Sequence, residues 1–176
     1  AHRLLFQDLD GDGDRDLVLL HRRALNAHRF NPSDTPTAPA RGSLRILRND
    51  GAAAGFTDVT ATALPAALAG FRGMAIAAGD IDQDGRVELV VGTREALVDG
   101  QGRALPSTRI LWGGDGLVFT LRDEFVPGTS VDTGEVTGLL FGDLDRDGLL
   151  ELLMLGEDAP RTSTGGELLR MFEWQR

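Results

Sequence analysis

The residues with the clearest chemical meaning are aspartates on alternate positions of three short segments. The segments read DLDGDGDRD from Asp8, DIDQDGRVE from Asp80 and DLDRDGLLE from Asp143. Carboxylates at positions one, three and five of such a loop turn toward one point, and glycine at position six permits the sharp reversal. Oxygen ligands without His or Cys favour Ca²⁺ over zinc or iron. The pattern therefore predicts a calcium loop, three times over.

Two further loop positions would complete each set of calcium ligands. Position seven would contribute a neutral backbone carbonyl, from Asp14, Arg86 or Leu149. Position nine would contribute a closing carboxylate, from Asp16, Glu88 or Glu151. An EF-hand needs a bidentate Glu at position twelve, where this chain has Leu19, Val91 and Met154. A solvated acidic turn that binds nothing is the alternative for one loop, and the repetition of the pattern disfavours it.

The elements that must position these loops repeat with them. Each loop lies between two short apolar stretches, for example GMAIAAG before and ELVVG after the second loop, and a third stretch follows a variable polar segment. The first two units add a fourth stretch, at 55–60 and 116–121. Runs this short, bounded by Gly, Asp and Asn, are typical of strands. Residues 60–70 are Ala-rich and predict a connection between the first two units with one helical turn.

Four strands per unit predict an all-β chain of β-propeller blades, each made of four antiparallel strands. The count is about three blades, so the propeller is partial. We expect blade 1 at residues 1–72, blade 2 at 73–135 and an incomplete blade 3 at 136–176, all within one propeller-type domain. The open ends would expose apolar sheet faces, centred on Leu4, Leu5 and Phe6 and on Met171, Phe172 and Trp174. Trp112 and Trp174 are expected to pack between blades.

Composition and motifs argue against several classes of partner and activity. The formal net charge of −9 argues against nucleic acid and anionic membrane surfaces as partners. No apolar run approaches the roughly 20 residues of a membrane span. The histidines His2, His21 and His28 have no metal or triad spacing, and no nucleophile motif occurs, so no catalytic residue is assigned.

The stretches LRNDGAAAGFTDVT from Leu47 and GMAIAAGDIDQDGRVELVVG from Gly73 resemble FG-GAP/VCBS repeats. These repeats form integrin-alpha-type β-propellers and their bacterial and cartilage-acidic-protein relatives. The resemblance implies a calcium loop in the first hairpin of each blade, hence about three Ca²⁺ per chain. The ligands it implies are Asp8, Asp10, Asp12 and Asp16 in the first site, Asp80, Asp82, Asp84 and Glu88 in the second, and Asp143, Asp145, Asp147 and Glu151 in the third. Complete propellers of the family look seven-bladed, so further blades are implied.

The leading hypothesis is a non-enzymatic calcium-binding propeller segment that acts in structure, adhesion or protein–protein interaction. Its partners would be a protein or further blades of the same propeller. The alternatives are an accessory or catalytic domain of an extracytoplasmic enzyme and a carbohydrate-binding module. Weak calcium sites are filled outside the cytosol, which predicts a secreted, cell-surface or periplasmic protein. The variable segments 21–43, 93–107 and 156–166 either form a binding face or merely tolerate drift.

Overall fold

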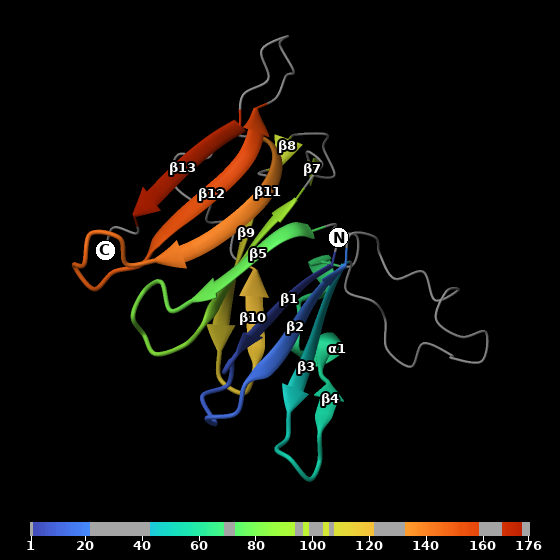
Figure 1. The fold of residues 1–176 in the computed structure, drawn as a ribbon. Coiled ribbons are helices and arrows are strands. Elements are labelled where there is room, and N and C mark those ends of the chain that lie inside the picture. The colour runs from blue at the N-terminus through green and yellow to red at the C-terminus, as the bar shows by residue number, and fades with distance from the viewer. Residues whose placement is uncertain are drawn as a thin grey trace.

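The computed structural model is built from antiparallel sheets (Figure 1). It describes residues 2–21, 43–68, 73–93, 97–98, 104–105, 108–121, 133–158 and 167–173. The prediction of an all-β chain is confirmed, and so are antiparallel four-stranded sheets in the first two units. Within the described part, no helix is long and apolar enough to cross a membrane.

The first sheet is a meander in the order β1-β2-β3-β4. Its strands are β1 (His2–Gln7), β2 (Asp16–His21), β3 (Leu44–Asn49) and β4 (Phe56–Asp58). Buried and half-buried residues alternate along β2, as expected for a strand with one face in the core. One helical turn follows, α1 (Thr60–Ala63), and then a short 3₁₀ turn, η1 (Ala66–Leu68), where the sequence predicted a connection.

The second sheet has the order β10-β9-β6-β5. Its strands are β5 (Gly73–Gly79), β6 (Glu88–Thr93), β9 (Thr108–Gly114) and β10 (Val118–Leu121). A two-stranded sheet of β7 (Leu97–Val98) and β8 (Ala104–Leu105) lies between β6 and β9 in sequence. The sequence analysis did not predict this small hairpin, because its segment was read only as a variable loop.

The third sheet has the described order β11-β12-β13. These strands are β11 (Thr133–Gly142), β12 (Glu151–Asp158) and β13 (Glu167–Glu173). β11 begins at Thr133, ahead of the predicted start of the third unit at residue 136, and its pairing with β12 contains register shifts. The three sheets are ordered along the chain, and β5 lies between β1 and β11 (Figure 1).

Apolar clusters join neighbouring sheets. Val18 and Ile46 of the first sheet share a buried cluster with Leu89 and Leu111 of the second. Trp112 shares another cluster with Leu152 of the third sheet and is 3% exposed, so it packs between two sheets, as expected. Trp174 lies outside the described residues. Burial of large side chains at both junctions makes the apolar faces the main source of cohesion between sheets.

The second and third sheets approach closely at two glycines. A Cβ at Gly79 would lie 2.8 Å from Leu150 Cδ1, and one at Gly92 would lie 2.5 Å from Val136 Cγ1. At Gly92 the new atom would meet Cγ1 and the rigid Cβ of Val136, so it would push the sheets apart there; at Gly79 it would meet the flexible end of Leu150, which can turn aside. The absence of a side chain at Gly92 therefore permits the close approach of these two sheets.

The outermost sheet faces are apolar and exposed. Leu4 and Phe6 on the first sheet are 66% and 53% exposed, whereas Leu5 packs against the core. On the third sheet Leu169 and Met171 are 68% and 61% exposed. They pair with Leu155 and Leu153 of β12, which places all four on one face. The predicted open faces are therefore seen at Leu4, Phe6 and Met171, whereas the prediction was wrong for Leu5, which faces the other side of β1; the Phe172 side chain and Trp174 lie outside the described part.

Candidate metal centres

Each aspartate segment connects the first two strands of a sheet. Loop one (residues 8–16) joins β1 to β2, loop two (residues 80–88) joins β5 to β6, and loop three (residues 143–151) joins β11 to β12. In every loop, position one directly follows the first strand and position nine begins the second. The strand pair therefore holds both ends of the loop at a fixed separation.

Position nine supplies a buried carboxylate. Asp16, Glu88 and Glu151 are 0%, 1% and 3% exposed. One oxygen of each accepts the position-two N–H, at 2.9 Å from Leu9, 3.0 Å from Ile81 and 2.6 Å from Leu144. This shared bond holds the start of the loop against the second strand.

The other carboxylate oxygen at position nine distinguishes the three loops. Asp16 Oδ1 accepts the Asn49 N–H at 2.9 Å, and Glu88 Oε1 accepts the Gly113 N–H at 3.4 Å. Glu151 Oε1 is buried and has no hydrogen-bond partner within the described residues. Leaving a carboxylate oxygen buried and unpaired is costly, so a cation at this point would satisfy it.

The glycines at position six adopt the conformation that the sequence analysis required. Gly13, Gly85 and Gly148 have φ of 92°, 87° and 90°. Their N–H groups donate to Oδ2 of the position-one aspartate at 3.0, 3.0 and 3.2 Å. Position four is also left-handed in every loop, with φ of 78° at Gly11, 58° at Gln83 and 66° at Arg146. The sequence analysis missed this second reversal, for which Gly11 was the only signal.

The carboxylates at positions one, three and nine converge. Within each trio, one oxygen from each residue lies within 4.8 Å of the others, and the trios are Asp8, Asp10 and Asp16; Asp80, Asp82 and Glu88; and Asp143, Asp145 and Glu151. Position five lies outside these trios. Its Oδ1 accepts the position-seven N–H at 2.8 Å in each loop, from Asp14 to Asp12, Arg86 to Asp84 and Leu149 to Asp147. The structure thus brings three carboxylates together per loop and holds the fourth beside them.

Burial and crowding disfavour charge on these carboxylates. Burial raises the pKa of Glu88 to about 7, with a smaller contribution from the charge of Asp82. Burial is also the main cause that raises the pKa of Asp16, and burial followed by the charge of Asp12 raises the pKa of Asp10. A cation among them would favour the ionised forms. The donors are all carboxylate oxygens, and this set fits Ca²⁺, whereas Mg²⁺ demands octahedral geometry and keeps its waters.

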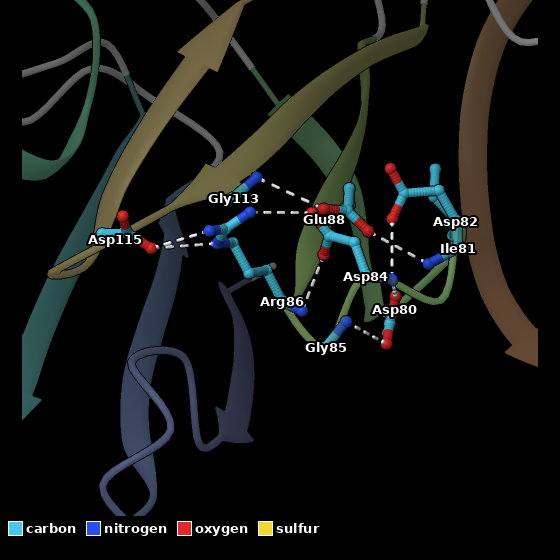
Figure 2. A network of polar contacts seen from close by, with 9 residues as sticks. All are labelled: Asp80, Ile81, Asp82, Asp84, Gly85, Arg86, Glu88, Gly113 and Asp115. Carbon is cyan, nitrogen blue, oxygen red and sulfur yellow. Dashed lines mark hydrogen bonds and ion pairs between the residues drawn. The ribbon is translucent and has the colours of Figure 1, made fainter.

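Loop two carries an additional ionic network (Figure 2). Arg86, at position seven, donates through Nη1 to Asp84 Oδ2 at 2.9 Å. Its Nε and Nη2 donate to Asp115 Oδ1 at 3.1 and 2.8 Å. Asp115 lies in the turn between β9 and β10. Sequence reasoning assigned Arg86 only a carbonyl role and gave no signal for this contact with a distant turn.

Part of the repeated sequence matches a known protein family. The family model described as an FG-GAP-like repeat matches residues 8–91, from the start of loop one into β6. Comparisons with curated proteins and with solved structures gave no significant match. The matched range contains loops one and two and the strands between them. Residues 8–91 are therefore similar to an FG-GAP-like repeat, which confirms over this range the family resemblance drawn from the sequence.

Proposed function

We propose that this chain is a calcium-binding repeat scaffold that acts in structure, adhesion or protein–protein interaction. The observation that carries the proposal is the threefold convergence of carboxylates at positions one, three and nine within 4.8 Å. Crowded carboxylates repel one another unless a cation is present. The unpaired buried oxygen of Glu151 supports the same reading, because it lacks a donor among the described residues.

Calcium would serve the fold directly. Each loop joins the two strands that start a sheet, so an ion bound by its two ends would hold that hairpin closed. The backbone carbonyls of Asp14, Arg86 and Leu149 would add neutral ligands, and the position-five carboxylates Asp12, Asp84 and Asp147 would approach the ion from the side of the loop. We expect dissociation constants on the order of 0.1–1 mM, as in extracellular modules. Such sites are filled outside the cytosol, which is why we propose a secreted, cell-surface or periplasmic location.

The sheets would be consecutive blades of a propeller. The exposed apolar faces of the first and third sheets support this, because the buried junctions between neighbouring sheets are formed by similar apolar faces. We propose that each outer face is covered by another antiparallel sheet of the same kind, supplied by a longer chain or another subunit. Closed propellers typically have 4–8 such sheets.

Titration calorimetry with Ca²⁺ tests the function. We expect about three ions per chain, and Asp10→Asn, Asp82→Asn and Asp145→Asn should each remove one. Asp14→Asn is the matched control, because the Asp14 side chain lies outside the converging trio of loop one. Fewer than two ions in the folded chain would contradict the proposal. A hydrolase panel and a glycan array on the calcium-loaded protein would detect the enzymatic and carbohydrate-binding alternatives.

A further inference from the structure

Loop two differs from the other loops in what holds its position-five carboxylate. Asp84 Oδ2 accepts Arg86 Nη1 at 2.9 Å, and Asp84 Oδ1 accepts the Arg86 N–H at 2.8 Å. Both oxygens of Asp84 are thus bound by one residue. The side chains of Arg86 and Asp84 are 44% and 38% exposed, so this ion pair lies at the protein surface beside the converging carboxylates.

The corresponding carboxylates of the other loops are less engaged. Asp12 and Asp147 accept the position-seven N–H through Oδ1, and their Oδ2 atoms form no hydrogen bond or ion pair with the residues that the structure describes. Position seven is Asp14 in loop one and Leu149 in loop three, neither of which is a cation. An ion entering loop one or three therefore finds an available position-five oxygen, whereas loop two presents one already paired.

Arg86 has a second partner that can retain it. Asp115 Oδ1 receives both Nε and Nη2 of Arg86, at 3.1 and 2.8 Å, from the turn between β9 and β10 (Figure 2). The Asp115 side chain is 92% exposed. Because these two bonds are independent of the bond to Asp84, Arg86 can leave Asp84 and stay paired.

We propose that Arg86 is an internal cation that competes with a metal ion for Asp84, so that loop two binds Ca²⁺ more weakly than it would without this arginine. The inference rests on the proposed calcium-binding function. The guanidinium and the ion carry like charges, and both interact favourably with the same carboxylate, so the ion gains Asp84 only by displacing Arg86. Asp115 is a positioning residue, since it keeps its two bonds to the guanidinium when Arg86 leaves Asp84.

Calorimetry on the full chain, with Ca²⁺ at about 0.15 M salt, tests the competition. Asp82→Asn first identifies the binding step that belongs to loop two. Arg86→Gln should tighten that step about two- to fivefold, the range expected from the strength of an exposed ion pair. Arg146→Gln is the charge-matched control, because Arg146 lies in loop three and forms no ion pair within the described part of the chain; its effect should stay below about twofold.

Asp115→Asn tests whether Asp115 acts by holding Arg86 or only through its own negative charge. In the parent chain it should weaken the loop-two step about two- to threefold, because Asp84 is then the one remaining acidic partner of Arg86 among the described residues. In the Arg86→Gln background it should have no effect, whereas a long-range charge effect would persist there. If the loop-two step is unchanged or weaker in Arg86→Gln, the inference about Arg86 is wrong. The proposed calcium-binding function still holds in that case if the chain binds three ions. A folded chain that binds no ion at any loop would overturn both.

Discussion

The amide Nε2 of Gln83 donates to the carbonyl oxygen of Gly148 at 2.6 Å. This bond joins position four of loop two to position six of loop three, so two candidate metal loops on neighbouring sheets contact each other directly. Gln83 reaches its partner from a left-handed backbone conformation, with φ of 58°. Gly11 holds the same position in loop one and has no side chain with which to make such a contact.

Gln83→Ala should therefore weaken the junction between the second and third sheets. We expect the free energy of unfolding to fall by about 0.5–1.5 kcal/mol, the net value of one hydrogen bond. Urea denaturation in excess chelator measures it. Arg146→Ala is the control, because it places the same alanine at φ of 66° and removes no bond between loops among the residues that the structure describes. Equal losses in the two variants would show that the bond contributes nothing.

Removal of metal should destabilise the chain. At about 1 mM free Ca²⁺ and a dissociation constant of about 0.1 mM, each independent site adds about 1.4 kcal/mol, or about 4 kcal/mol for three. For a chain of 176 residues this corresponds to roughly 10 °C in Tm. Calorimetric melting with calcium and with excess chelator measures the difference. Superimposable melting curves would refute a bracing role for the ions.

Without metal, stability should depend on pH through Glu88. Its folded pKa of about 7 exceeds the ordinary value of 4.5, so between these values the folded chain retains a proton that the unfolded chain has released. Stability from this group is therefore greatest below about pH 4.5, falls as pH rises toward 7 and is flat above. Tm measured in chelator across this window should fall more steeply in the parent chain than in Glu88→Gln, whose amide does not titrate. Parallel slopes would contradict the prediction.

The reversal at position six should be intolerant of a Cβ for conformational reasons alone. A Cβ at Gly85 would meet no atom within 4 Å, yet φ there is 87°. Gly85→Ala should cost about 1–2 kcal/mol through backbone strain, and Gly85→Asn should cost less because Asn tolerates left-handed φ. Chemical denaturation in chelator ranks the variants. Equal stability of the alanine variant and the parent chain would show that the loop can relax.

The isolated chain should self-associate through its apolar outer faces. Leu4 and Met171 are 66% and 61% exposed on the first and third sheets. Sedimentation velocity should show concentration-dependent association, and Leu4→Gln together with Met171→Gln should reduce it. Val118→Gln is the control, since Val118 is 44% exposed but belongs to the second sheet. A strictly monomeric parent chain would refute the need for covering sheets.

Short-range pattern was enough to predict much of the fold. The stretch GMAIAAG at 73–79 forms β5 with the predicted limits, because a short apolar run that ends at an acidic loop is typical of a strand. The position-six glycines were predictable because a left-handed reversal has a residue preference. The donors Asn49 and Gly113 and the partner Asp115 were not, since each comes from a strand or turn distant in sequence. Contacts between residues so distant in sequence produce no local sequence pattern from which they could be predicted.

Because Gly79 and Gly92 carry no side chain, they have a geometric consequence beyond close packing. Gly79 ends β5 beside loop two, whereas Gly92 pairs with Ala75 near the start of β5, so the third sheet comes close to the second at both ends of this hairpin. A methyl group at Gly92 would meet Val136 at 2.5 Å and separate the two sheets at that end only. A single hydrogen atom in place of a methyl group thus contributes to the angle at which the second and third sheets meet.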